Sequence, residues 1–110
     1  MRVLIIGASK GIGLGTTRRA FEAGHVVRAF ARSAASIAVS GPDLEKVPGD
    51  ALKSEDVEAA LIGMDVVIQT LGVGLGDLFR PVTLFSEATR VLIAAMQAHG
   101  VERLISVTGF

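Results

Sequence analysis

The sequence contains no cysteine, no tryptophan and no tyrosine. Without cysteine the chain can form no disulfide bond and can use no thiolate in catalysis, and its composition does not mark a redox compartment. An excess of charge is missing too, because 11 basic residues balance 11 acidic ones. No overall field therefore attracts nucleic acid or an anionic membrane, and any affinity for anions must arise from a local arrangement of groups.

Long apolar runs are also absent, since none reaches the length that a membrane-spanning helix needs. The segment from Met1 to Val3 leads at once into a strand-like run, which is too short and too early for a signal peptide. We therefore expect a cytoplasmic protein with no membrane partner. The 110 residues, half of them hydrophobic, suffice for one domain, 1–110, with a buried core. Because no histidine or acidic pair has metal-ligand spacing on one element, we predict no metal site.

Apolar runs and helix-like segments alternate along the chain. Strands are expected at residues 2–6, 25–30, 44–47, 65–70 and 102–107, and helices at 12–23, 54–62 and 82–99. In the first helix one side is expected to hold Ile12, Thr16 or Thr17, Ala20 and Phe21. Ser54 is predicted to cap the second helix, and glycines 24, 63 and 100 are expected to end the three helices.

Alternating strands and helices predict an α/β fold with a parallel sheet. Right-handed crossovers and one reversal after the third strand give the strand order 3-2-1-4-5 of a Rossmann-type, doubly wound sheet. Such a domain normally continues past its fifth strand. We therefore expect residues 1–110 to be the N-terminal half of a longer domain, with the fifth strand as an exposed apolar edge.

The stretch IIGASKGIGLG, from Ile5 to Gly15, follows the first predicted strand and opens the first helix. Gly7 permits a tight turn, Gly11 lets the backbone approach a diphosphate, and Gly13 lets the helix pack closely on the sheet. The helix N-terminus then directs unpaired N–H groups at the anion. This context predicts a dinucleotide site; the alternative is that the glycines only make a turn and allow helix packing.

The end of the second strand bears on the choice of nucleotide. NAD-specific sites usually carry an acid there, about 20 residues after the glycines, whereas this chain has Arg32 and no acid. Arg32 and Lys10 could together hold a 2′-phosphate. The planar guanidinium of Arg32 can bind the phosphate through two hydrogen bonds, and the ammonium of Lys10 adds a positive charge. We therefore predict NADP(H) as the cofactor in preference to NAD(H), the alternative being that both cations are ordinary solvated charges.

Several stretches resemble a known family: the glycine loop with Lys10, Val47-Pro-Gly-Asp50, the run from Ala59 to Ile68 with Leu71-Gly72, and the segment from Phe85 to Thr108. The chain is similar to atypical short-chain dehydrogenases/reductases, namely NAD(P)H-binding, NmrA-like proteins, and most similar to the biliverdin-IXβ reductase/flavin reductase group. It departs from that group where a second arginine would stand, at Ala35 or Ser36, and where Gly109 replaces a serine.

The resemblance implies a role for each matching position. The diphosphate would lie against the glycine loop, the 2′-phosphate against Arg32, the adenine against Asp50 and Ala51, and the nicotinamide beside the end of the fifth strand. The cofactor-binding residues implied are Gly7, Ser9, Lys10, Gly11, Ile12, Gly13, Arg32, Asp50, Ala51, Leu71, Gly72 and Thr108. No catalytic residue is assigned, because the Tyr–Lys pair of many short-chain dehydrogenases needs a tyrosine.

In those dehydrogenases the Tyr–Lys pair protonates the carbonyl of the substrate. Flavins and quinones accept a hydride with less need for such an acid, so the expected activity is NADPH-dependent reduction of a flavin, a quinone or a similar conjugated acceptor. The expected partner is therefore a small-molecule hydride acceptor. Two alternatives stay open at this point: a non-catalytic NADP(H) sensor of the NmrA-like type, and a sugar-nucleotide epimerase or dehydratase. The fold alone does not choose among them.

Overall fold

A computed structural model describes residues 1–9, 11–70 and 81–106, and in the last helix it describes side chains from residue 87 onward. The described elements are, in chain order, β1 (Arg2–Ile6), α1 (Gly11–Glu22), β2 (Val26–Ala31), the 3-10 turn η1 (Ala34–Ser36), β3 (Leu44–Pro48), α2 (Ser54–Leu61), β4 (Val66–Gln69), α3 (Pro81–His99) and β5 (Arg103–Ser106). Each predicted strand and helix is present.

The five strands form one parallel sheet in the order β3-β2-β1-β4-β5, which confirms the predicted topology. At the carboxyl edge Ile6 of β1 lies beside Phe30 of β2 and Gln69 of β4. Gln69 in turn lies beside Ser106, the last residue of β5. The direction of winding therefore reverses between β1 and β4, the place where doubly wound sheets bind ligands.

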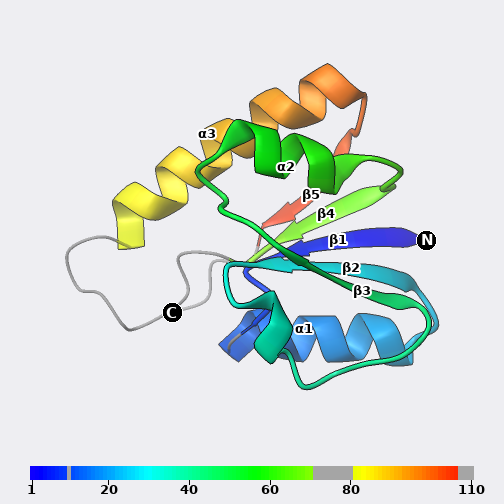
Figure 1. The fold of residues 1–110 in the computed structure, drawn as a ribbon. Helices are drawn as coiled ribbons and strands as arrows, with labels where there is room; N and C mark the ends of the chain where they lie inside the picture. The colour runs from blue at the N-terminus through cyan, green and yellow to red at the C-terminus, as the bar shows by residue number, and fades with distance from the viewer. Residues whose placement is uncertain (10, 71–80, 107–110) are drawn as a thin grey trace.

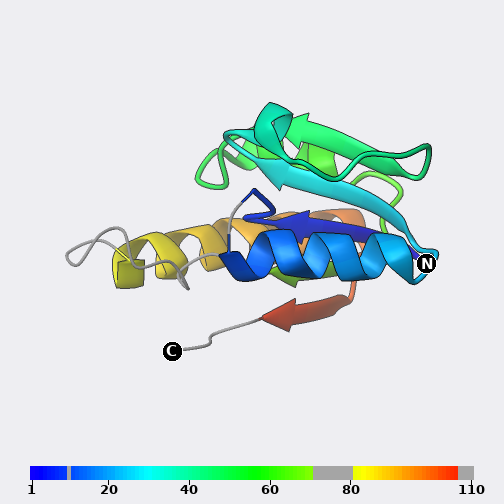
Figure 2. The ribbon, with the colours of Figure 1, turned by 90° about the horizontal axis from the view of Figure 1, so that it is seen from below.

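Helices cover both faces of the sheet, with α1 on one side and α2 and α3 on the other (Figure 1; Figure 2 shows α1 in front of the sheet). Strand β1 is buried on both faces from Val3 to Ile6, as its unbroken aliphatic run predicts. Two apolar clusters result. The buried residues under α2 and α3 are Leu4, Ile6, Phe30, Val57, Ala60, Leu61, Met64, Val67, Leu92, Ala95 and Met96, and those on the α1 side are Val3, Ile5, Ala8, Val27, Ala29, Ala34, Ile37 and Val66.

Glycines end the helices as predicted. Gly24 adopts a φ of 91°, and the amide of His25 donates to the carbonyl of Ala20 while that of Gly24 donates to Phe21. This is a Schellman ending, which needs a left-handed residue. The last carbonyls of α2 are held differently, by Arg28 of β2: its Nη1 donates to Ala60 (2.7 Å) and to Ile62 (2.8 Å).

Two details of the helices differ from the prediction. Ser54 is the first helical residue and not the cap, because a turn closed by the Lys53 amide on the Asp50 carbonyl keeps Lys53 extended, and Lys53 becomes the N-cap. Ile12 is 43 % exposed. The buried residues of α1 are Gly13 and Thr17, one turn apart, so Ile12 points about 100° away from the sheet.

The fifth strand forms an exposed edge, as expected. Arg103, Ile105 and Ser106 are exposed, and Ile105 leaves 52 % of its surface open. The opposite edge, β3, carries Glu45 and Lys46 among its five residues. Charges of this kind discourage a further strand from pairing, and β5 has fewer of them.

Candidate functional site

The turn after β1 is fixed to β2 by its own backbone. Gly7 has a φ of 83°, a left-handed conformation that L side chains rarely adopt. The amides of Gly7 and Ala8 both donate to the carbonyl of Phe30, at 3.0 and 3.3 Å. The chain therefore leaves the sheet at Gly7 in a direction set by the end of β2.

From the other side the same turn is held by Thr70, which follows β4. Its hydroxyl donates to the carbonyl of Ile6 (2.8 Å) and lies 3.1 Å from that of Gly7, and its amide donates to Ile6 (3.0 Å). Helix α1 then packs directly on this point. A Cβ added at Gly13 would lie 1.8 Å from the Gly7 carbonyl oxygen and 2.6 Å from the Thr70 hydroxyl. Only glycine fits there, as the sequence predicted.

The N-terminus of α1 offers room for an anion. Gly11 has a φ of 53°, and among the described residues beyond its chain neighbours and its own helix a Cβ at this position would meet no atom within 4 Å. The first turn of α1 holds no acidic residue, so no negative charge within the helix opposes its positive dipole end or the N–H groups that point out of its first turn. Ser9 is half-buried beside the turn, and Ile12 is exposed. Open space beside Gly11, next to hydrogen-bond donors, fits the diphosphate of a dinucleotide.

Two neighbouring strand ends extend this edge. Arg32 is exposed and directly follows the last residue of β2. The amide of Gly49, which follows β3, donates to the carbonyl of Ala31 (3.2 Å). Asp50 comes next, and its backbone amide is held by the carboxylate of Asp56 in α2 (2.9 Å). The geometry thus places Arg32 and Asp50 at adjacent strand ends, on the side of the turn away from β4.

The carboxylate of Asp50 already has one partner within the chain. Its Oδ1 accepts from the amide of Leu52 at 2.9 Å, which closes a local turn. Ala51 is partly buried and packs against the core cluster under α2 and α3. Asp50 is half-buried, and its Oδ1 is the oxygen that the turn engages.

Two polar residues at the end of β4 are missing from the predicted site. Thr70 braces the glycine turn, and Gln69 is completely buried, with its Oε1 accepting from the hydroxyl of Thr89 in α3 (3.1 Å). A signal was present, because two polar residues, Gln69 and Thr70, directly follow the apolar run from Val66 to Ile68. Their partners, however, are set by the pairing of β4 with β1 and by the packing of α3.

The predicted site residues therefore fall into three groups. Gly7, Ser9, Gly11, Ile12 and Gly13 share one turn and helix start, and Arg32, Asp50 and Ala51 follow the adjacent strands. The remaining predicted residues, Lys10, Leu71, Gly72 and Thr108, lie outside the described residues.

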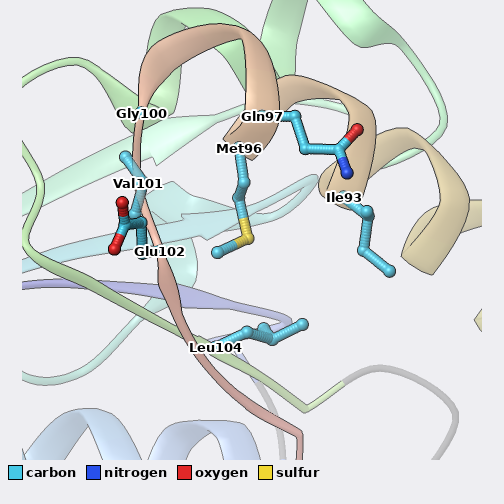
Figure 3. Close-up of a pocket in the computed structure, with 7 residues that line it drawn as sticks. All are labelled: Ile93, Met96, Gln97, Gly100, Val101, Glu102 and Leu104. Atoms are coloured by element: carbon cyan, nitrogen blue, oxygen red, sulfur yellow. The ribbon is translucent and has the colours of Figure 1, made fainter.

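A separate hollow of about 480 Å³ lies away from this edge, between the end of α3 and β5 (Figure 3). Side chains of Ile93 and Met96 face Leu104 across it, and Gly100 and Val101 close one end. The full lining is Ile93, Met96, Gln97, Gly100, Val101, Glu102 and Leu104. These residues belong to the second half of α3, the connection that follows it and β5, so the hollow is not part of the glycine-turn site.

The two histidines lie away from the glycine turn. The Nδ1 of His25 is 3.4 Å from the terminal amino group of Met1, and the Nε2 of His99 is 3.1 Å from Oε1 of Glu58, which links α3 to α2. In the described part of the chain, no three histidine or acidic side chains gather where they could bind one metal ion. Within the same residues no helix is long and apolar enough to cross a membrane.

The sequence is similar to that of a 3-beta-hydroxysteroid dehydrogenase from Mycolicibacterium neoaurum, with 33 % identity over 115 aligned positions. The alignment covers 94 % of this chain and 31 % of that protein. A Rossmann-fold NAD(P)-binding family protein from Shigella flexneri is similar in structure, with 27 % identity and a TM-score of 0.74 over 94 % of this chain and 49 % of the other.

Two further solved structures share the fold. One is a uronate dehydrogenase variant from Agrobacterium tumefaciens complexed with NAD (23 % identity, TM-score 0.81, 96 % of this chain and 40 % of the other). The other is a short-chain dehydrogenase/reductase from Veillonella parvula in complex with NADP (14 % identity, TM-score 0.78, 96 % and 46 %). The chain thus spans less than half the length of each of these four proteins. The profile of the NAD(P)H-binding family matches residues 7–110, and the chain belongs to that family.

Proposed function

We propose that this chain binds NADPH at the carboxyl edge of its sheet and provides the nucleotide site of an NADPH-dependent oxidoreductase. One observation carries the proposal: the β1–α1 turn is built so tightly that a Cβ at Gly13 would overlap the Gly7 carbonyl, while in the part of the chain that the structure describes the space beside Gly11 is open. A turn that needed only to reverse the chain would not require this contact. It brings the start of α1 against the sheet and leaves its N–H groups facing outward toward the diphosphate.

The preference for NADPH over NADH rests on Arg32. This side chain is exposed at the end of β2, where an NAD-specific site would carry an acid to bind the ribose hydroxyls. A guanidinium group can instead bind a 2′-phosphate through two parallel hydrogen bonds. We place Lys10 at the same phosphate. Asp50, at the neighbouring strand end, is placed at the adenine amine through Oδ2, and Leu71, Gly72 and Thr108 along the rest of the nucleotide.

When bound, the nicotinamide supplies the hydride, so the chain's own residues bind the cofactor and orient it. We propose a flavin, a quinone or a similar conjugated molecule as the acceptor, and the biliverdin-IXβ reductase/flavin reductase group as the nearest subgroup. The likeness to a 3-beta-hydroxysteroid dehydrogenase supports a second candidate, in which the same nucleotide site serves oxidation of an alcohol. Two assays separate these candidates. Consumption of NADPH in the presence of FMN or a quinone supports the first, and reduction of NADP⁺ in the presence of a 3β-hydroxysteroid supports the second.

The binding proposal is tested by calorimetric titration of Arg32→Ala with NADPH and with NADH. Losing about two charge-assisted hydrogen bonds should weaken NADPH binding by more than about tenfold and leave NADH binding nearly unchanged. Arg19→Ala is the matched control, because Arg19 is an exposed arginine in the last turn of α1, at the far end of the helix. Equal losses for both nucleotides in Arg32→Ala would show that Arg32 does not hold the 2′-phosphate.

A further inference from the structure

Gln69 presents an unusual combination of burial and incomplete hydrogen bonding. The side chain is fully buried at the end of β4. Its Oε1 accepts a hydrogen bond from Thr89, but among the residues that the structure describes its Nε2 has no hydrogen-bond partner, and this atom has almost no exposed surface. Buried N–H groups without a partner are rare in folded proteins, since each costs about as much as a lost hydrogen bond.

A structural role accounts for only half of this side chain. The Thr89 hydroxyl joins β4 to α3 through Oε1, yet a valine or leucine at position 69 would fill the space under α3 without a buried amide. The neighbouring residue on the same face of β4, Val67, is apolar and fully buried. An amide that keeps a donor unpaired in such a place suggests a partner that arrives with a ligand.

The position of Gln69 indicates which part of a ligand it meets. The glycine turn lies at the end of β1, with Arg32 and Asp50 on its β2 and β3 side. If the diphosphate binds at the turn and the adenosine half lies toward β2 and β3, the other half of the dinucleotide must lie toward β4 and β5. Gln69 ends β4 and pairs in register with Ser106, which ends β5.

We infer that Gln69 is a positioning residue for the nicotinamide half of the dinucleotide, donating from Nε2 to one of its oxygen atoms, a ribose hydroxyl or the carboxamide carbonyl. The inference rests on the proposed function, because it requires a dinucleotide at the glycine turn. Thr89 fixes the orientation of the amide by holding Oε1, so the donor is presented in one direction. Without ligand the unpaired donor destabilises the protein, and with ligand it contributes to affinity.

The test is Gln69→Met, which keeps the length and shape of the side chain and removes the amide. Binding is titrated with NADPH and with 2′,5′-ADP, which lacks the nicotinamide half. We expect NADPH affinity to fall about five- to tenfold and 2′,5′-ADP affinity to stay within about twofold. The unfolding midpoint of the nucleotide-free protein should not fall, because removing the unpaired buried donor offsets the loss of the Oε1–Thr89 hydrogen bond. Gln97→Met, the same change at an exposed position on α3, should alter neither quantity.

The outcomes separate this inference from the proposed function. Wild-type protein that binds neither probe would overturn both. Wild-type protein that binds NADPH, with Gln69→Met binding it equally well, would overturn only the role of Gln69, as would an equal loss of both probes. If Gln69→Met does not fold, Gln69→Asn shortens the amide and retains its chemistry. Selective loss of NADPH in that variant supports the inference, and unchanged affinity overturns it.

Discussion

Two glycines in α1 allow the tight packing at the turn to be measured directly. Gly13 and Gly15 lie two residues apart in the same helix, and Gly→Ala is the same chemical change at both. At Gly15 the new methyl group would meet no atom of the described residues within 4 Å outside the helix's own nearby backbone. At Gly13 it would lie 1.8 Å from the Gly7 carbonyl oxygen, whereas carbon and oxygen normally approach to about 3.3 Å, so the helix must move by about 1.5 Å, the difference between the two.

The two substitutions should have opposite effects on stability. Alanine is favoured over glycine in a helix interior by about 1 kcal/mol, so Gly15→Ala should raise the free energy of unfolding by about 0.5–1 kcal/mol. Gly13→Ala has the same gain, but overpacking of this kind costs about 1–3 kcal/mol. The backbone carbonyl of Gly7 cannot rotate away as a side chain could, so we expect the cost of overpacking to lie at the upper end of this range. The variants should therefore differ by about 2–3 kcal/mol.

Urea denaturation followed by far-ultraviolet circular dichroism measures this difference, since the chain has no tryptophan or tyrosine to report by fluorescence. Titration with NADPH adds a second readout: Gly13→Ala should bind weakly, because the start of α1 shifts away from the sheet, and Gly15→Ala should bind as the wild type does. Equal stability of the two variants would show that helix and turn are not in close contact and would remove the main support for the nucleotide site.

Two other side chains carry predictions about stability that thermal unfolding can check. Thr70→Val removes the buried hydroxyl that braces Ile6 and Gly7 and should lower the free energy of unfolding by about 1–2 kcal/mol. Thr70→Ser retains the hydroxyl and should lower it by less. The reverse order would contradict the bracing role. Arg28→Met should cost about 2–3 kcal/mol, because its side chain is only 14 % exposed and two carbonyls at the end of α2 lose their donor. A loss no larger than that in Glu45→Gln, whose carboxylate is 58 % exposed, would count against this anchor.

The strands and helix ends could be predicted closely because their causes are local. The aliphatic run from Arg2 to Ile6 is a strand with the predicted limits, and glycines stop the helices where a left-handed residue is needed. Ser54 shows where local reasoning fails. Serine is a good N-cap, but the preceding turn, closed between Asp50 and Lys53, decided where the helix begins. The prediction for Ile12 was wrong for a similar reason, since only the packing of α1 on the sheet determines which face of the helix is buried.

The candidate site was predictable only in part. The glycine spacing identified the turn, because each glycine has a requirement that the local backbone imposes. The residues that support the turn were not identified. Thr70 reaches Gly7 across 63 positions of sequence, and Gln69 meets Thr89 only because α3 packs over β4. Contacts of this kind depend on strand register and helix docking, which a single sequence does not encode in a recognisable pattern.

The double hydrogen bond to the carbonyl of Phe30 has a consequence for binding entropy. Glycine-rich segments are usually the most mobile parts of a chain, and ordering them on a ligand lowers affinity. Here the amides of Gly7 and Ala8 are already engaged, so this part of the loop loses its freedom during folding and not during association. A nucleotide would meet a preorganised surface, and the amide protons of these two residues should exchange slowly with solvent even before it arrives.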